Sequence, residues 1–66
     1  MKNTLRVQRA IKEITQEELA TAINVSRQAI NAIELKRYSP STVLSLKIAR
    51  YFGKQVEEIF ILEDFD

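Results

Sequence analysis

Residues 15–34 of the chain read TQEELATAINVSRQAINAIE, a pattern typical of two short helices separated by a tight turn. Thr15 and Glu18 have the spacing of a capping box, in which the Thr hydroxyl and the Glu carboxylate each accept a backbone amide proton at the helix start. A helix is therefore expected over about residues 16–23. Asn24 tolerates left-handed backbone and is expected to end this helix.

A second helix is expected over about residues 27–34, with Ser26 as its cap. A serine at this position holds about 1 kcal/mol of helix stability. Each helix has its apolar residues on one face. These residues are Leu19, Ala20 and Ile23 in the first helix and Ala29, Ile30 and Ile33 in the second. Two helices joined by such a turn form a helix-turn-helix motif.

Composition limits what kind of protein the chain can form. Its 66 residues make one small domain, whose core is only marginally sufficient, so support from a second copy is expected. The absence of cysteine and histidine argues against disulfides, metal sites and histidine-dependent catalysis. No apolar run approaches the roughly 18 residues that span a bilayer, and no signal-peptide pattern is present. We therefore expect a cytoplasmic protein that is not an enzyme and has no cofactor, metal, small-molecule ligand or membrane partner.

Charge is unevenly distributed along the chain, although the net charge is only +1. Residues 1–54 hold all ten Lys and Arg residues against four acidic ones, which gives +6, whereas residues 55–66 hold five acidic residues and no basic one. The basic part is therefore the candidate nucleic-acid surface. The acidic tail is expected to lie away from DNA because it repels phosphate.

The motif TQEELA, followed by an apolar residue, a short turn and SRQAINAIE, resembles the lambda-repressor-like (Cro/CI, XRE) family of helix-turn-helix DNA-binding proteins. The likeness covers about residues 5–60. It implies an all-α domain of five helices that occupies the single domain 1–66. The other three helices are expected at Leu5–Lys12, between a Ser41 cap and Gly53, and at Val56–Phe60.

The polar face of residues 27–34 is the predicted base-reading surface. Opposite its apolar face the helix presents four residues, Arg27, Gln28, Asn31 and Ala32. Arginine pairs with guanine O6 and N7, glutamine and asparagine pair with adenine N6 and N7, and alanine contacts a thymine methyl. Since the N-terminal part of the second helix enters the major groove, Arg27 and Gln28 are expected to read bases first.

A second group of residues is expected to contact the DNA backbone, which positions a protein without reading sequence. The resemblance places Gln16 in this group, because glutamine at that place in the family commonly contacts a phosphate. Lys36, Arg37 and Tyr38 follow the second helix and carry donors suited to phosphate oxygens, although a merely solvated basic loop is the alternative for them. The expected set is Gln16, Ser26, Lys36, Arg37 and Tyr38.

Glu34 lies about 40° from Ile30 on a helical wheel, close to the buried face. An unpaired buried charge is costly, so this carboxylate needs a cationic partner. The resemblance supplies Arg9 at the matching position of the first helix. We predict a partly buried Arg9–Glu34 ion pair that ties the two helices together without contacting DNA.

The first helix has an unusual outer face. If Leu5 points inward, Gln8 points inward with it, whereas Val7 and Ile11 point outward. Either this helix is rotated by part of a turn, or Val7 and Ile11 are covered by the C-terminal segment or by a second subunit.

The C-terminal segment, residues 61–66, carries more apolar surface than a free tail should expose. We expect it to be extended, to pair with the N-terminal residues in a short antiparallel two-stranded sheet, and to pack over Val7 and Ile11. A dimer interface is expected beside it, formed by Ile59, Phe60, Ile61 and Leu62.

Together these features predict a sequence-specific DNA-binding transcriptional regulator that acts as a homodimeric repressor on double-stranded DNA with a pseudo-palindromic operator. Occlusion of a promoter is the expected means, because the chain has no room for an effector domain. The alternative is an antitoxin-like or regulatory module that uses the same fold to bind another protein, which the apolar patches of the first helix and the tail favour.

Overall fold

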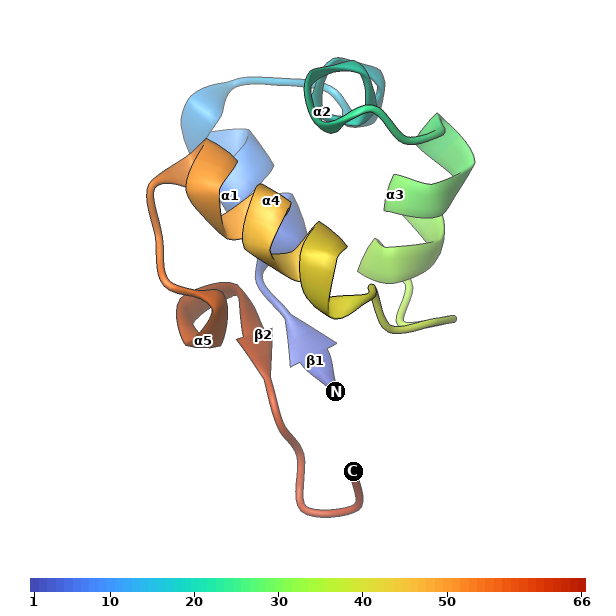
Figure 1. Ribbon diagram of the computed structural model, residues 1–66, viewed down its shortest axis with the longest axis vertical. Helices are drawn as coiled ribbons and strands as arrows, with labels where there is room; N and C mark the ends of the chain where they lie inside the picture. Colours follow the sequence, from blue (N-terminus) through green and yellow to red (C-terminus); the bar gives the residue numbers. More distant parts are fainter.

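The chain folds into five helices and one two-stranded sheet, and the computed structural model describes all residues, 1–66 (Figure 1). The elements are β1 (Lys2–Asn3), α1 (Leu5–Lys12), α2 (Gln16–Ile23), α3 (Arg27–Glu34), α4 (Thr42–Phe52), α5 (Val56–Ile59) and β2 (Phe60–Ile61). The predicted all-α class with a short terminal β-pairing is confirmed. None of the helices is both long and apolar enough to cross a membrane.

Capping side chains set the starts of α2, α3 and α4. Thr15 Oγ1 accepts from the Glu18 amide at 3.0 Å, and a Glu18 carboxylate oxygen accepts from the Thr15 amide at 2.9 Å, which completes a capping box. Ser26 and Ser41 each accept an amide proton from the residue three positions further on, at 3.1 Å. Because these bonds are local, they fix the start of α3 at Arg27 independently of the rest of the fold.

Four residues of the chain have left-handed backbone. Asn24 (φ 62°) and Gly53 (φ 65°) end α2 and α4 in this conformation, as expected. Glu13 (φ 56°) ends α1 in the same way, and Lys36 (φ 62°) adopts it in the loop after α3. A side chain with a Cβ atom costs roughly 1 kcal/mol in this region, so Glu13 and Lys36 carry backbone strain.

Replacing Glu13 with glycine is expected to stabilise the domain by about 0.5–1 kcal/mol, because glycine adopts a positive φ without this clash. The Glu13 side chain is exposed and makes no hydrogen bond or ion pair that the change would remove. Glu17→Gly is the matched control, since the same change in the first turn of α2 costs about 1 kcal/mol. Urea denaturation measures both changes, and a less stable Glu13→Gly protein would contradict the argument from strain.

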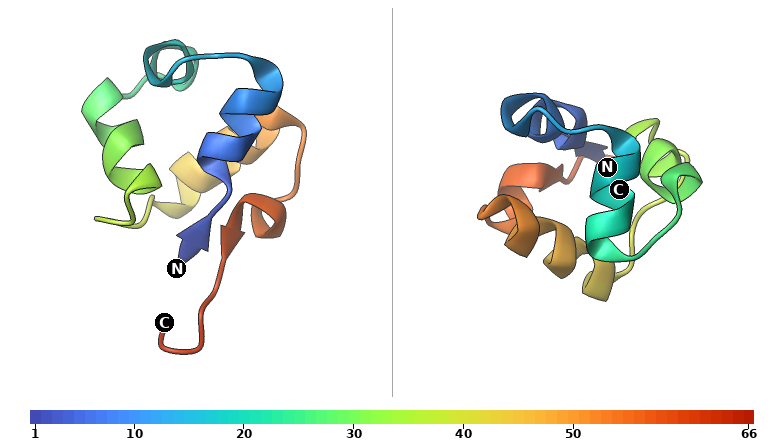
Figure 2. Two further views of the ribbon diagram at one scale, coloured as in Figure 1. Left: turned by 180° about the vertical axis from the view of Figure 1, so that it is seen from behind. Right: turned by 90° about the horizontal axis from the view of Figure 1, so that it is seen from above.

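The core contains only apolar side chains, and every helix contributes to it. α2 packs against both α3 and α4, and α5 packs against α4. Figures 1 and 2 show α2 at one end of the molecule, α3 along one side, and the two chain termini at the end opposite to α2. The buried residues are Leu5, Leu19, Ala20, Ile23, Ile30, Ile33, Ile48, Ala49, Ile59 and Phe60.

The two ends of the chain pair in an antiparallel sheet, as predicted. Lys2 is opposite Ile61 and Asn3 is opposite Phe60. α5 ends at Ile59, one residue earlier than expected, because the extended backbone of Phe60 (φ −114°, ψ 120°) belongs to β2. The strand β2 therefore begins directly after the last residue of α5.

The expectation that the C-terminal segment covers α1 is wrong. The side chains of Val7 and Ile11 are 55% and 72% exposed, and Leu62 and Phe65 are also open to solvent. After β2 the segment turns back toward the Met1 ammonium instead of crossing α1, because its carboxylates are held there by charge. Leu5 does point into the core, and Val7 and Ile11 point outward, as the helical wheel predicted for an inward Leu5.

The structure also changes the predicted dimer interface. Ile59 and Phe60 are 0% and 6% exposed and belong to the core of the single chain. Their side chains are therefore not available to a second copy. Of the four predicted residues only Ile61, which is half-buried, and Leu62, which is exposed, remain on the surface.

A cluster of charges, here called the terminal clasp, holds the two ends of the chain. The Met1 ammonium donates to Asp66 Oδ1 at 2.7 Å and lies 3.3 Å from Glu63 Oε1. Lys36 Nζ lies 2.9 Å from the same Glu63 oxygen. Since Lys36 belongs to the loop after α3, the acidic tail reaches a predicted phosphate contact, and the expectation that it lies away from that surface is wrong at Glu63.

The terminal clasp is expected to be fully formed between about pH 5 and pH 8 and to open outside this range. Asp66 raises the pKa of the Met1 ammonium above its ordinary value of 8.0, so the contribution of this ammonium is complete below pH 8 and is lost as pH rises through the raised pKa. Lys36 lowers the pKa of Glu63 below 4.5, and the Met1 ammonium lowers that of Asp66 below 3.8. The contributions of these carboxylates are therefore lost as pH falls through the lowered values.

This pH range can be measured by NMR, because the Asp66 amide donates to the Glu63 carbonyl at 3.0 Å within the clasp. Its resonance is expected to be constant inside the range and to shift on both sides of it. Glu63→Gln should reduce the shift of this resonance at low pH. Glu57→Gln, a change outside the clasp, should leave the shifts at both low and high pH unchanged. A resonance that did not move at either extreme would contradict the clasp.

Candidate nucleic-acid interface

The outer face of α3 is open to solvent along one side of the molecule (Figures 1 and 2). The two isoleucines of α3 are buried in the core, whereas Arg27, Gln28 and Asn31 are exposed on the opposite face. Ala32 is half-buried. Three of the four predicted base-reading side chains therefore lie on one accessible strip of a helix, the element that fits the major groove of DNA.

Arg27 and Gln28 are free of the rest of the protein. Their side chains take part in none of the hydrogen bonds or ion pairs within the chain. Arg27 therefore keeps its full fork of guanidinium donors, and Gln28 keeps both the donor and the acceptor of its amide. These are the groups that guanine and adenine edges bind.

Arg9 and Glu34 are brought together beneath α3. Arg9 Nε donates to Glu34 Oε2 at 2.6 Å and Arg9 Nη2 donates to Glu34 Oε1 at 3.0 Å, which gives a two-pronged ion pair between α1 and α3. The Glu34 side chain is only 3% exposed. The hydrogen bonds to Glu34 raise the pKa of the Arg9 guanidinium above its ordinary value, so this group stays charged. Arg9 Nη1 also donates to the Ile14 carbonyl at 3.1 Å, which fixes the plane of the guanidinium.

Gln16 reaches the same carboxylate from α2. Its Nε2 atom lies 3.1 Å from Glu34 Oε1 and 3.1 Å from Asn31 Oδ1. Arg9, Glu34, Gln16 and Asn31 therefore form a continuous series of hydrogen bonds, here called the Arg9–Asn31 chain. The sequence placed Gln16 in solvent against a phosphate, whereas in the structure it is half-buried and both protons of its amide are used within the protein.

The other predicted phosphate contacts lie at the two ends of α3. Ser26 accepts the cap bond and keeps its hydroxyl proton for another acceptor. At the opposite end, Arg37 and Tyr38 are exposed, while Lys36 is held by Glu63. Donors therefore flank the outer face of α3 at both ends, which is where a helix in the major groove meets the DNA backbone.

Asn3 connects the N-terminal strand to two helices. Its Oδ1 atom accepts from the Leu5 amide at 3.1 Å, at the start of α1. Its Nδ2 atom also donates to the Ile33 carbonyl at 2.9 Å, which ties β1 to the end of α3. This second bond joins residues 30 positions apart, and no local pattern could have indicated it.

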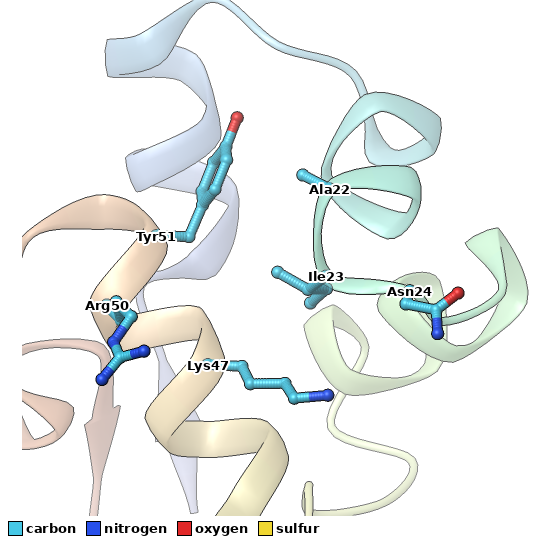
Figure 3. Close-up of a pocket in the computed structure, with 6 residues that line it drawn as sticks. All are labelled: Ala22, Ile23, Asn24, Lys47, Arg50 and Tyr51. Carbon is cyan, nitrogen blue, oxygen red and sulfur yellow. The ribbon is translucent and has the colours of Figure 1, made fainter.

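A hollow of about 440 Å³ opens between α2 and α4, away from the outer face of α3 (Figure 3). Figure 3 shows Lys47 extending from α4 toward Asn24 at the end of α2. No predicted site residue lines this hollow, so it is not part of the candidate interface. Its lining consists of Ala22, Ile23, Asn24, Lys47, Arg50 and Tyr51.

Two short helices, α2 and α3, that pack against each other across a turn closed by the Ser26 cap define the class of helix-turn-helix proteins. Comparison with known proteins gives the same class. A family model described as helix-turn-helix matches residues 5–59, and the chain belongs to this family in its Cro/CI type. The family resemblance predicted from the sequence is thus confirmed.

Several relatives are similar to the chain over nearly its whole length. An HTH-type transcriptional regulator of Methanocaldococcus jannaschii is 53% identical over 64 residues, which cover 97% of each chain. One of Methanothermobacter thermautotrophicus is 46% identical over 65 residues, which cover 97% of this chain and 94% of the relative. The HTH-type transcriptional regulator YgzD of Bacillus subtilis is 41% identical over 64 residues, again 97% of each chain.

Proposed function

We propose that the protein is a sequence-specific DNA-binding transcriptional regulator, which represses transcription as a homodimer on a pseudo-palindromic operator. The observation that carries this proposal is the outer face of α3, where Arg27 and Gln28 present unpaired donors and acceptors beside Asn31. Family membership and the names of the relatives as transcriptional regulators support the same function. Binding at a promoter would then repress by excluding other proteins.

Homodimerisation is supported by the apolar side chains that the single chain leaves exposed. Leu62 follows β2 directly and lies beside the half-buried Ile61, and adjacent apolar residues on a surface are a feature of protein–protein contact sites. A two-fold dimer of this motif places its recognition helices about 34 Å apart, one turn of DNA. The longest dimension of the chain is 32 Å, so two copies side by side can give this spacing.

Selection of binding sites from random DNA duplexes, with the mass of the free protein measured by light scattering, tests this proposal. A dimer that recovers a two-fold motif with half-sites about 10 bp apart is the expected result. The slope of log affinity against log salt should be about −0.9 for each phosphate contact. A monomer that recovers no motif, and binds DNA only weakly at low salt, would overturn it.

Two charge substitutions locate the dimer interface. Leu62→Asp is expected to give a monomer, because the new carboxylate would be buried without a partner in the proposed interface. Ile11→Asp should leave the dimer intact, because Ile11 lies outside that interface. The reverse result would place the interface on α1.

The exposed apolar face of α1 favours a second candidate function. Val7 and Ile11 are exposed on the outer face of α1, opposite the buried Leu5. Such a surface suits a module that binds another protein through α1, without any contact from α3. In that case Ile11→Asp would abolish binding of the partner, while substitutions on α3 would not.

A further inference from the structure

We infer that Gln16 is a positioning residue for base recognition: it fixes the orientation of the Asn31 amide and thereby sets the base preference at the position that Asn31 contacts. This inference rests on the proposed function. It gives Gln16 a role different from the phosphate contact that the family resemblance implied, and it follows from the donors and acceptors of the Arg9–Asn31 chain.

The first step concerns the hydrogen-bonding groups of the Gln16 amide that are not already used within the protein. Its Nε2 atom carries two protons, and these point to Glu34 Oε1 and Asn31 Oδ1, each 3.1 Å away. The remaining polar atom of the amide is an oxygen, which only accepts hydrogen bonds. Phosphate oxygens also only accept, so the Gln16 side chain has no donor for a phosphate while this arrangement holds.

The second step concerns the direction of the chain. Glu34 is a buried carboxylate that is held by two donors of Arg9, so it can only accept. Gln16 must therefore turn its nitrogen, and not its oxygen, toward Glu34. The second proton of that nitrogen points to Asn31, and two donors cannot bond each other, so Asn31 presents its oxygen to Gln16. A buried charge pair between α1 and α3 thus dictates the orientation of an exposed amide.

The third step concerns what Asn31 can recognise in this orientation. The terminal torsion of a free asparagine is broad and roughly two-fold, so its oxygen and nitrogen exchange places easily. With Oδ1 held by Gln16, the Nδ2 protons face away from α2 and one lone pair of Oδ1 stays free. One donor beside one acceptor matches adenine N7 and N6. A released amide could instead donate to thymine O4 or accept from cytosine N4, so its preference would be weaker.

The test is site selection from random duplexes with the full chain and two variants. Asn31→Ala identifies the base pair that depends on Asn31. Gln16→Met, which keeps the length of the side chain and removes its hydrogen bonds, is expected to lower discrimination at that same base pair by about 5- to 150-fold. Preferences at the other positions and the salt slope should be unchanged. Gln28→Met is the matched control, since it makes the same change on a side chain with no bonds in the chain, and it should alter a different base pair.

Other outcomes overturn the inference. Equal loss of affinity for all sequences, with a salt slope shallower by about 0.9, would make Gln16 a phosphate contact. An unchanged preference in Gln16→Met, or an Asn31→Ala variant with unaltered selection, would also reject it. If the unsubstituted chain selects no motif at all, the proposed function itself has failed, and this result differs from all of the others.

Folding of the Gln16→Met protein needs a separate measurement, because Gln16 also contacts Glu34. Thermal unfolding reports it, and the double variant Gln16→Met with Asn31→Ala should select the same sites as Asn31→Ala alone. If Gln16→Met does not fold, the unsubstituted chain still decides the matter by NMR. The Gln16 amide protons should exchange at least ten-fold more slowly than those of Gln28, and equal exchange rates would reject the inference.

Discussion

Replacing Arg9 with methionine is expected to lower the free energy of unfolding by about 3–5 kcal/mol, because it leaves the Glu34 carboxylate buried without a cation. Domains have roughly 0.05–0.15 kcal/mol of stability per residue, so this loss is comparable with the whole stability of so short a chain. Gln16 remains as a neutral donor to Glu34 and compensates only in part. Urea denaturation followed by circular dichroism measures the effect.

Two further variants separate the buried pair from general effects of charge. Arg6 also lies near the carboxylate, with Nε at 4.0 Å from Glu34 Oε1, but its side chain is 77% exposed. Arg6→Met should therefore cost no more than about 0.5 kcal/mol. The double change of Arg9 and Glu34 to methionine should recover much of the loss, since no unpaired charge is left. Equal losses in Arg6→Met and Arg9→Met would contradict the structural role of the pair.

Replacing Arg27 and Gln28 together with alanine is expected to weaken operator binding by about 30-fold to 20,000-fold, since each good side chain–base pair contributes about 1–3 kcal/mol. The free energy of unfolding should change by less than about 0.5 kcal/mol, because both side chains are exposed and unbonded within the chain. Electrophoretic mobility shift of the selected operator measures affinity, and thermal unfolding measures stability.

The control removes one positive charge elsewhere. Arg50 lies on α4 at the hollow between α2 and α4, away from the outer face of α3 (Figure 3). Arg50→Ala should reduce affinity only slightly and equally for all sequences. If the change at Arg27 and Gln28 had no larger effect than Arg50→Ala, base reading by α3 would be rejected, and the exposed face of α1 would become the better candidate site.

The parts of the fold that the sequence predicted correctly depend on local interactions. The Thr15–Glu18 capping box and the Ser26 and Ser41 caps each join residues three positions apart, so their spacing is visible in the chain itself. The left-handed Gly53 is another such signal. Amphipathic periodicity then indicates which face of α2, α3 and α4 lies in the core, and the resemblance to the helix-turn-helix family implied the five-helix class.

The parts that were predicted wrongly, or not predicted at all, depend on contacts between distant residues. The path of the tail is set by the Met1 ammonium and Lys36, which only the folded chain brings to Glu63. Ile59 and Phe60 have the composition of either a core or an interface, and periodicity over so short a helix cannot distinguish the two. For Gln16, the bond to Asn31 depends on how α2 crosses α3, which local patterns do not contain.

The unequal attachment of the α3 side chains bears on how such a protein can change its target during evolution or design. The side chains of Arg27 and Gln28 are exposed and make no hydrogen bond or ion pair within the chain, so each can be exchanged singly for a residue that prefers another base. Asn31 is connected through Gln16 to a buried charge, so a new preference there requires compatible changes at two positions on different helices. Target sites should therefore diversify readily at the bases facing the start of α3, and slowly at the base facing its middle.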